Sequence, residues 1–546
     1  MPNGLSHRAF RVAALAFTVL WFALLWGRPL YDPDEGRYAE IPREILTGGD
    51  WLIPHLDGLV YLEKPPLQYW LSALAQLSCG DSEGIARLWT GVFGYLTLVV
   101  VFGLARHLWG AAAAIRASLL LAGSVLFVLL GHQLTLDMTL CFWLVAGMAC
   151  FIRAQTLDAG GRAARAWMLG CWAAMALAVL TKGLIGVLIP GATLLIYVLW
   201  QRDWALLRRL EPAAGLVLFL VIAAPWFVLA SRANPEFLRF FFIREHFQRF
   251  LTPIEERSEP WWFFIPVLIV GVLPWVTQAL RALGGDWRAS APRGQFDPVR
   301  LLWIWSVFVL LFFSASNAKL IPYILPALPT LALLAARPRA AGLRGHLVAG
   351  AALSAVFALG VLAYASALWA SPRGLELALR LRPALCALSA LLLAGAGGCL
   401  WYVGQQRPTR ALASLSAGWC GAVVALTVGA CVVADLFSAR ELAATIARQP
   451  NAAAPVFSVQ NYQQSLSFYL RRTVTLVDYR DEFALGLRQD PARGIASLEA
   501  FAARWAELPD ALAVMPRSTR ERLDAAGVPM REIGCFPTRL CLMSRY

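Results

Sequence analysis

Four carboxylates fall within nine residues, directly after an apolar stretch that is long enough to cross a bilayer. They are Asp32, Asp34, Glu35 and Glu40 in the segment YDPDEGRYAEIPREI. The simplest interpretation is that acids at a helix start cap its N-terminus and complement its dipole. That interpretation suits Asp32 and Glu35. We expect Asp34 to be the central catalytic carboxylate, because other polar groups are predicted at the same membrane level.

The same segment has helical periodicity. Tyr38, Ile41 and Ile45 recur on one face, which predicts a short amphipathic helix on the outer membrane surface. Glu35 and Glu40 are then expected on the exposed surface of this helix.

A second group of polar residues stands in YLEKPPLQYW, residues 61–70. Two prolines follow Glu63 and Lys64 and deny helical conformation to the residue before them, so an extended turn is expected. A surface ion pair is the plain alternative. The functional interpretation is that Lys64 binds a phosphate, that Glu63 binds a metal ion or a sugar, and that Tyr61 contributes to substrate binding.

Two further groups stand at the ends of apolar spans. Asp137, in GHQLTLDMTLCFW, is followed by apolar residues, and a carboxylate in that setting is usually functional, with helix capping as the alternative. Lys319 and Tyr323, in SASNAKLIPYILPALP, are spaced one helical turn apart as substrate-binding candidates. The prolines there break the helix at membrane depth, which is tolerated beside a cavity. Lys182 is predicted on the same outer side.

The segment EFLRFFFIREHFQRF would place Arg239, His246 and Arg249 on one stripe if it were an α-helix. Such a helix would lie at the interface and present its two arginines to a phosphate, with ordinary snorkelling to lipid phosphates as the alternative. The apolar residues expected to lie in lipid are Phe237, Phe240, Phe241, Phe247 and Leu251.

All five groups are predicted on one side of the membrane. Cations would stabilise a departing phosphate, and a carboxylate would orient or deprotonate the attacking group. The pattern predicts group transfer from a lipid-linked donor outside the cytoplasm. No motif requires a cofactor. His55, Glu63 and His246 are suitable zinc ligands by type, which leaves a divalent metal in the outer loops as an open alternative.

The composition sets the class of protein that must position these groups. Of 546 residues, 59% are hydrophobic and 15% are charged, against about a quarter charged in soluble proteins. This indicates an all-α polytopic membrane protein whose first apolar run is retained as a helix. The net charge of +14 does not indicate nucleic-acid binding, because the arginines fall between the apolar runs.

About thirteen windows have bilayer length. They lie near 9–30, 86–106, 112–131, 136–153, 166–181, 183–200, 213–231, 260–281, 299–315, 319–336, 345–370, 383–403 and 411–434. The basic loops alternate, so the positive-inside rule predicts a cytoplasmic N-terminus and an outer C-terminal segment. We expect a transmembrane domain over 1–434, with long outer loops at about 31–85 and 232–259.

The segment 435–546 is predicted to form a small extracytoplasmic α/β domain. APVFSV, TVTLVDY, ALAVMP and RLCLMS read as strands, and STRERLDAAG reads as a helix. Cys535 and Cys541 lie in this segment, where a disulfide can form.

Two long motifs, DPDEGRYAEIPREI with EKPPLQYW, and NAKLIPYILPALPTLALL, resemble the bacterial lipid A aminoarabinose transferases. These are GT-C polyprenyl-phosphate glycosyltransferases related to protein O-mannosyltransferases. The resemblance implies transfer of 4-amino-4-deoxy-L-arabinose from undecaprenyl phosphate to lipid A, with inversion at the sugar and resistance to polymyxin. It further implies a multi-pass protein of the bacterial inner membrane, which we expect to be a monomer.

The resemblance also assigns roles to residues. It implies that Asp34 is the central carboxylate, that Glu63 lies on the acceptor or metal side, and that Lys64 binds the donor phosphate. Asp137 is carried over as a further catalytic group, whereas Arg249 and Tyr323 are phosphate ligands by position alone.

Two other functions stay open at this stage. One is a polyprenyl-phosphate-sugar transferase that acts on protein or on another glycan. The other is a transporter of lipid-linked sugars, which would carry ionisable groups near the midplane of several spans. The spans here hold few charges, and this favours the enzyme.

Overall fold

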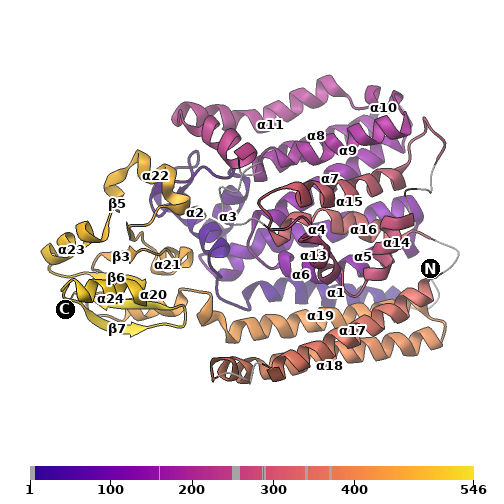
Figure 1. Ribbon diagram of the computed structural model, residues 1–546. Helices are drawn as coiled ribbons and strands as arrows, with labels where there is room; N and C mark the ends of the chain where they lie inside the picture. Colours follow the sequence, from indigo (N-terminus) through magenta and orange to yellow (C-terminus); the bar gives the residue numbers. More distant parts are fainter. Residues whose placement is uncertain are drawn as a thin grey trace. The chain divides into compact units, whose positions relative to one another are not determined.

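The computed structural model describes residues 7–158, 160–248, 259–285, 287, 291–338, 342–367 and 372–545. The chain forms two compact units (Figure 1). The first comprises residues 1–25 and 88–429, and the second comprises residues 26–87 and 430–546. Each unit therefore contains two stretches that are distant in the sequence.

The first unit is helical, as the apolar windows predict. α7 packs against α8, α8 against α11, and α17 runs along α18 (Figure 1). Its helices are α1 (His7–Ala23), α4 (Glu83–Trp109), α5 (Ala111–Ala122), α6 (Val125–Gly131), α7 (Leu136–Gln155), α8 (Arg162–Lys182), α9 (Ile185–Gln201), α10 (Ala205–Arg208), α11 (Pro212–Ala233), η2 (Arg239–Gln248), α13 (Phe264–Gly271), α14 (Val276–Gly285), α15 (Pro298–Ala315), η4 (Ile321–Ile324), α16 (Ala327–Ala336), α17 (Leu343–Ala367), α18 (Pro372–Gly404) and α19 (Pro408–Val432).

Eight of the described helices are long and apolar enough to cross a membrane. The bent pair α5 and α6, which meet at 71°, would add a ninth span. Shorter apolar helices cover Arg11–Trp26, α9 and α16. A polytopic membrane protein is confirmed, and the count of thirteen spans stays a prediction.

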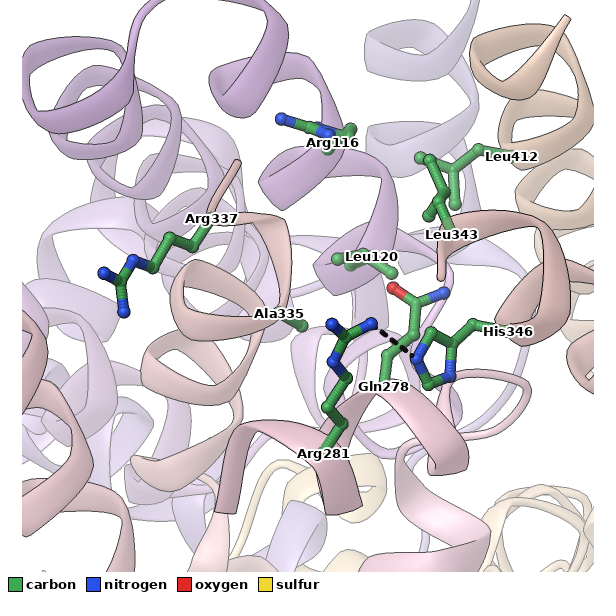
Figure 2. Close-up of a pocket in the computed structure, with 9 residues that line it drawn as sticks. All are labelled: Arg116, Leu120, Gln278, Arg281, Ala335, Arg337, Leu343, His346 and Leu412. Atoms are coloured by element: carbon green, nitrogen blue, oxygen red, sulfur yellow. Dashed lines mark hydrogen bonds between the residues drawn. The ribbon is translucent and has the colours of Figure 1, made fainter. Parts of the chain in front are cut away.

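One end of this bundle holds a pocket of about 480 Å³ (Figure 2). It lies among the start of α5, α14, the end of α16, and the first turns of α17 and α19. Its lining residues are Arg116, Leu120, Gln278, Arg281, Ala335, Arg337, Leu343, His346 and Leu412.

The second unit contains a six-stranded sheet with strand order β5-β4-β3-β6-β8-β7. The first four strands in this order pair in parallel, and β8 pairs antiparallel with both β6 and β7. The elements are η1 (Leu24–Trp26), α2 (Asp34–Gly48), β1 (His55–Leu56), β2 (Leu59–Val60), α3 (Leu67–Cys79), η6 (Ala434–Leu436), α20 (Arg440–Ala447), β3 (Val456–Val459), α21 (Gln464–Leu470), β4 (Thr475–Val477), η7 (Asp481–Phe483), α22 (Ala484–Gln489), η8 (Pro491–Arg493), β5 (Gly494–Ile495), α23 (Leu498–Glu507), β6 (Leu512–Pro516), α24 (Arg517–Ala525), β7 (Arg531–Cys535) and β8 (Leu540–Ser544), with η1 at the junction of the two units.

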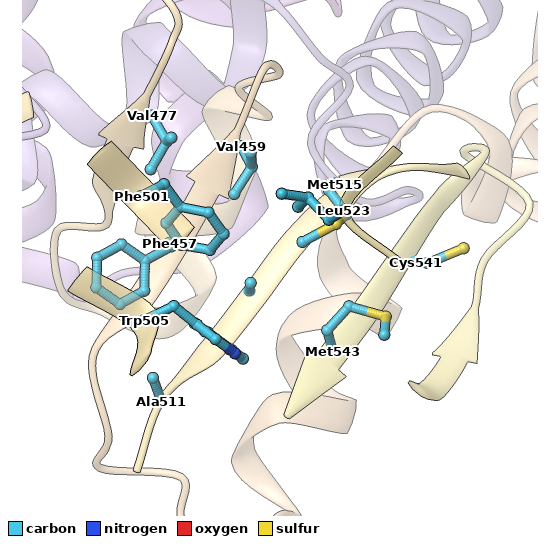
Figure 3. Close-up of a cluster of buried hydrophobic side chains, with 11 residues drawn as sticks. Phe457, Val459, Val477, Phe501, Trp505, Ala511, Met515, Leu523, Cys541 and Met543 are labelled. Carbon is cyan, nitrogen blue, oxygen red and sulfur yellow. The ribbon is translucent and has the colours of Figure 1, made fainter. Parts of the chain in front are cut away.

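The core of the sheet lies between the strands and two helices. Phe501 and Trp505 of α23 and Leu523 of α24 pack on Phe457 of β3 and Met543 of β8 (Figure 3). All four strands predicted from the sequence are present, together with the predicted helix, and the α/β fold of this segment is confirmed. β5 and β7 went unpredicted because their sequences, GI and REIGC, carry little alternation.

The two cysteines of this segment form a disulfide. Cys535 ends β7 and Cys541 lies opposite it on β8, with their Cα atoms 4.0 Å apart. The disulfide that the sequence left open is therefore present. The domain boundary after residue 434 stays a prediction, and the structure adds that residues 26–87 share a compact unit with the C-terminal segment.

Candidate active site

Helix α2 sets the position of the first acidic group. It begins at Asp34, after Pro33, and ends at Gly48. The next residue, Gly49, has a φ of +75° and donates to the carbonyl of Ile45, which is typical of a C-terminal glycine cap. At Gly36 a Cβ atom would lie 2.2 Å from the backbone nitrogen of Ser465. Only glycine allows α2 to approach the start of α21 this closely, so this residue fixes where Asp34 stands.

The carboxylate of Asp34 is accessible and paired on one side. Its side chain is 42% exposed, and Oδ1 accepts a hydrogen bond of 2.9 Å from Nη1 of Arg37. Arg37 is itself buried and pairs through Nε with Glu482 of η7, which also accepts a 2.7 Å bond from Gln464. Arg37 is therefore held by the C-terminal segment, and it holds Asp34 in turn.

Arg37 also connects Asp34 to the second predicted group. Its positive charge acts on the buried phenols of Tyr61 and Tyr38. Burial and the nearby carboxylate of Glu63 raise the pKa of Tyr61, and Arg37 opposes that shift. The Tyr61 hydroxyl donates to Oε2 of Glu63 at 3.1 Å. The structure thus brings Asp34, Tyr61 and Glu63 into one electrostatic cluster.

Lys64 completes this cluster. Its Nζ donates to the carbonyl of Glu63 at 3.0 Å and lies 4.0 Å from Oε2 of the same residue. Because α3 begins only at Leu67, Glu63 and Lys64 lie outside any helix, as the two prolines predict. Lys64 thus places a partly buried ammonium beside the carboxylate of Glu63.

A hairpin leads into this segment and anchors it. β1 and β2 are joined by Asp57 and Gly58, both with positive φ, which is the geometry of a type I′ turn. Oδ1 of Asp57 accepts bonds from the hydroxyl of Ser467 at 2.9 Å and the backbone of Val474 at 2.8 Å. Burial raises the pKa of Asp57 to about 7. This aspartate therefore ties the hairpin to the C-terminal segment.

The prediction that Asp32 caps helix α2 is wrong. Pro33 occupies the cap position, and no side chain caps the helix. Asp32 instead accepts bonds from the backbone of Ser465 at 2.6 Å and from its hydroxyl at 2.8 Å. Burial raises the pKa of Asp32 to about 7.

The prediction that Glu35 and Glu40 lie on an exposed helix surface is also wrong, because both side chains are fully buried. Glu35 accepts bonds of 2.8 and 2.9 Å from Arg87 and a bond of 2.9 Å from Arg28. Burial alone would raise its pKa, but the two guanidinium groups lower it to about 2. Glu40 pairs with Arg43 at 2.7 Å. Glu35 and Glu40 are therefore members of buried ion pairs with arginines.

The first unit holds a separate polar cluster. Asp137 stands in the first turn of α7, and Oδ1 accepts a 2.6 Å bond from Nζ of Lys182, the last residue of α8. The Lys182 ammonium also lies 5.0 Å from the centre of the Tyr323 ring. Asp137 and Tyr323 are therefore brought together through Lys182.

Lys319 takes a different position from the one expected. It precedes the short helix η4 that contains Tyr323, so the two are not one α-helical turn apart. Its Nζ is buried and donates to the carbonyls of Ser316 and Glu259. These bonds favour a role in holding the backbone, and substrate binding by Lys319 stays a prediction.

The segment predicted as an interfacial α-helix is a π-helix, η2. With more residues per turn, the spacing of seven and three no longer defines one stripe, so the expected alignment of Arg239 with His246 is wrong. Arg239 is exposed, whereas Arg249 and the side chain of His246 lie outside the described residues.

The lipid-facing assignment of the phenylalanines in this segment is wrong where it can be described. Phe237, Phe240 and Phe241 are buried, and the Phe237 ring lies 5.2 Å from that of Trp226 in α11. Contact between aromatic rings favours this inward packing over exposure to lipid. Phe247 and Leu251 fall on residues whose side chains are not described.

The zinc hypothesis is not tested. His55 lies 4.0 Å from Asp50, and the described residues contain one cluster of ligand type, Glu532 with Cys535 and Cys541, whose sulfurs are joined as a disulfide. Metal binding by Glu63, His55 and His246 stays a prediction.

Three residues of these clusters were not among the predicted site residues. Arg37 had a readable signal, an arginine three residues after an aspartate at a helix start. Lys182 lies between two closely spaced apolar spans, and the connection is too short for the sequence to predict a partner for this residue. Glu482 carried no signal, because it joins Arg37 from 445 positions away.

Known proteins resemble this chain over most of its length. The family model for the aminoarabinose transferase C-terminal domain matches residues 442–543, and that for dolichyl-phosphate-mannose-protein mannosyltransferase matches residues 13–241. Undecaprenyl phosphate-α-4-amino-4-deoxy-L-arabinose arabinosyl transferase 1 of Sodalis glossinidius is 35% identical over 75% of this chain and 70% of its own length. The transferase of Edwardsiella ictaluri is 37% identical over 59% of this chain and 58% of its own length.

A solved structure extends the match to the whole fold. The crystal structure of ArnT from Cupriavidus metallidurans bound to undecaprenyl phosphate has a TM-score of 0.91, with 32% identity, and covers 99% of each chain. The apo form of the same protein has a TM-score of 0.88 and covers 98% of this chain. The resemblance read from the two motifs, and the fold it implies, are confirmed.

Proposed function

Because this chain belongs to the undecaprenyl phosphate-α-4-amino-4-deoxy-L-arabinose arabinosyl transferase family, we propose that it transfers 4-amino-4-deoxy-L-arabinose from undecaprenyl phosphate to a phosphate of lipid A. The cluster of Asp34, Arg37, Tyr61, Glu63 and Lys64 is the observation that carries the proposal. It combines an accessible carboxylate with the ammonium group of Lys64. A sugar phosphate requires both kinds of group.

The donor phosphate is the leaving group of the reaction. The bond between the anomeric carbon and the phosphate oxygen breaks, and its electron pair remains on undecaprenyl phosphate. Lys64 stabilises that developing charge, and Glu63 with Tyr61 fixes where the ammonium stands. Tyr323, beside Lys182, is a second place where phosphate oxygens find a donor.

Asp34 has a role other than that of a strong base. An acceptor phosphate of lipid A is already anionic, so it attacks the anomeric carbon without losing a proton. Asp34 instead stabilises the positive charge that develops at this carbon, or pairs with the ammonium of the sugar. Arg37 and Glu482 hold the carboxylate in place.

The reaction takes place at the periplasmic face of the inner membrane. The alternation of basic loops supports this location, because the cluster-bearing segments belong to the series without excess arginine. The product carries fewer negative charges on lipid A, and this reduces the binding of polymyxin and other cationic peptides.

A transfer assay in detergent tests the proposal. The purified full-length chain is supplied with synthetic donor lipid and purified lipid A, and lipid A is analysed by mass spectrometry. We expect the aminoarabinose adduct with the wild type and its loss with Asp34→Asn. Because detergent leaves no compartments, lack of transfer by a folded protein would reject the enzymatic function. A parallel assay with chelator tests the zinc hypothesis.

Residues 13–241 match the family model for dolichyl-phosphate-mannose-protein mannosyltransferase, and this match favours a protein hydroxyl group as the alternative acceptor. With a protein hydroxyl as acceptor, Asp34 would have to remove a proton and would act as a general base. Transfer to a peptide but not to lipid A, in the same assay, would favour this second function.

A further inference from the structure

The pocket of the first unit contains charge that the proposed reaction does not use. Three of its nine lining residues are arginines, one is histidine, and none is acidic. The lining of the pocket is therefore suited in residue type to an anionic group.

The cation at its centre is preorganised. Nη1 of Arg281 lies 3.1 Å from Nε2 of His346, and Nδ1 of His346 lies 3.0 Å from the hydroxyl of Thr277 (Figure 2). A guanidinium group can only donate, so Nε2 must accept, and the proton of the neutral ring stands on Nδ1 and points to Thr277. This chain of bonds orients the guanidinium of Arg281.

The backbone also accommodates Arg281. Gly342 has a φ of +105°, and a Cβ atom there would lie 2.5 Å from Nη1 of Arg281. Glycine at this position therefore leaves the space that the guanidinium occupies beside the first turn of α17.

A buried amide is directed into the same space. Gln278 is only 5% exposed, and within the described part of the chain its Nε2 has no hydrogen-bond partner. Figure 2 shows its side chain converging with those of Arg281 and His346. A buried donor without a partner is unfavourable, and an anionic ligand would provide the missing acceptor.

The remaining arginines and two helix ends add to the positive potential. Arg116 and Arg337 also line the pocket, and Leu343 and Leu412 belong to the first turns of α17 and α19. Helix N-termini carry partial positive charge. Snorkelling would explain separate arginines at a membrane surface, but it does not explain a buried amide aimed at a fixed guanidinium.

We propose that this pocket is a phosphate-binding site, formed by Arg281 and Gln278 together with Arg116 and Arg337. None of these residues belongs to the clusters around Asp34 and Asp137. The ligand of the pocket is a phosphate group, carried by the headgroup of an anionic phospholipid or present as a free anion. The positive-inside rule places the pocket at the cytoplasmic ends of its helices, opposite the side proposed for transfer. The site would couple the protein to anionic lipid of the inner leaflet.

Native mass spectrometry of the full-length protein tests this site. The protein in neutral detergent is titrated with phosphatidylglycerol, with phosphatidylcholine as the zwitterionic control. We expect phosphatidylglycerol to bind the wild type at least tenfold more tightly than Arg281→Gln. Arg208→Gln, which removes an exposed arginine of α10 in the same unit, should bind like the wild type.

A second variant keeps the test valid if Arg281→Gln fails to fold, and inorganic phosphate as a second ligand identifies the source of the phosphate. Gln278→Met keeps the size of the side chain and removes the donor, and we expect it to weaken binding about threefold to tenfold. If millimolar inorganic phosphate displaces the lipid from the wild type, the site takes a free anion, and the proposed phosphate chemistry stands. Equal phosphatidylglycerol affinity in the wild type, Arg281→Gln and Gln278→Met would overturn the proposal.

Discussion

Two neighbouring acids in the first turn of α2 have opposite environments. Asp34 is 42% exposed and accepts one hydrogen bond from an arginine of its own helix, whereas Glu35 is fully buried between Arg28 and Arg87. The two carboxylates are adjacent in sequence and look equivalent there. The comparison teaches that the role of an acid at a membrane surface depends on the cations around it. Glu35, whose charge is balanced by two arginines, stabilises the fold, whereas Asp34 stays accessible to a substrate.

The largest effect that we expect is on stability, from Glu35→Gln. The substitution leaves the guanidinium groups of Arg28 and Arg87 without their counter-charge in a buried place, which costs about 3–5 kcal/mol. Thermal denaturation in detergent should show a much lower Tm, while the remaining folded protein keeps its specific activity. Glu441→Gln, an exposed acid of α20, serves as the control. An unchanged Tm with lost activity would contradict this prediction and would assign Glu35 a role in the reaction, as proposed for Asp34.

The next effect is on activity, from Asp34→Asn. Loss of one preorganised charge next to the reacting centre should lower kcat by about 10²–10³-fold. The Tm should change little, because the side chain is exposed and Arg37 keeps its bond to Glu482. The transfer assay with defined lipids measures the rate. Full activity of Asp34→Asn would remove this carboxylate from the mechanism.

A third test asks which of the two acids Asp137 resembles. Its pairing with Lys182 predicts that Asp137→Asn and Lys182→Met are coupled, with an interaction energy of about 0.5–3 kcal/mol in a double-mutant cycle. Activity and Tm are measured for the two single variants and the double variant. Coupling in activity would give Asp137 and Lys182 a role in the reaction, as proposed for Asp34. Coupling confined to Tm would give them a role in stability, as proposed for Glu35. Additive effects in both would show that the two side chains are not energetically coupled.

The smallest effect is a pH dependence that distinguishes Asp32 from Glu35. Asp32 has a pKa of about 7 in the folded protein and about 3.8 when unfolded, so the folded state binds more protons between these values. Its contribution to stability is therefore present at pH 4 and is lost as the pH rises through 7. Asp32→Asn should be within about 1 kcal/mol of the wild type at pH 5 and relatively more stable at pH 8.

Glu35 should show the reverse sign. Its pKa of about 2 lies below the unfolded value of 4.5, so its contribution is present above pH 4.5 and is lost as the pH falls towards 2. Tm measured against pH for the wild type and for Glu35→Gln checks this. A wild type whose acid sensitivity equals that of Glu35→Gln would contradict the proposed ion pair.

Local patterns predicted much of the fold. The apolar windows correspond to helices, and the strands β3, β4, β6 and β8 lie where alternation or apolar runs predicted them. Two cysteines that the sequence placed where a disulfide can form are bridged between antiparallel neighbours. These features depend on residues close in sequence, whose periodicity states which face is buried. The Asp-Gly turn of the β1–β2 hairpin was equally readable and was overlooked.

The roles of the acids around α2 were not readable in the same way. Ser465 donates a hydrogen bond to Asp32. Glu482 pairs with Arg37, and Arg37 in turn donates to Asp34. Ser465 and Glu482 each lie more than 400 positions along the chain from α2. No pattern local to YDPDEGRYAEIPREI distinguishes a capping acid from a buried ion pair.

The sequence by itself determined the membrane class, the family, the positions of the apolar helices and of the strands β3, β4, β6 and β8, and the residue types available for phosphate and sugar chemistry. The tertiary structure alone decided that Asp34 stays accessible while Glu35 and Glu40 are buried, and that Lys182 joins Asp137 to Tyr323. The physical reason is that burial and ion pairing are properties of the space around a side chain. That space is filled by segments remote in sequence, and the free energy of a charge depends on them far more than on its neighbours along the chain.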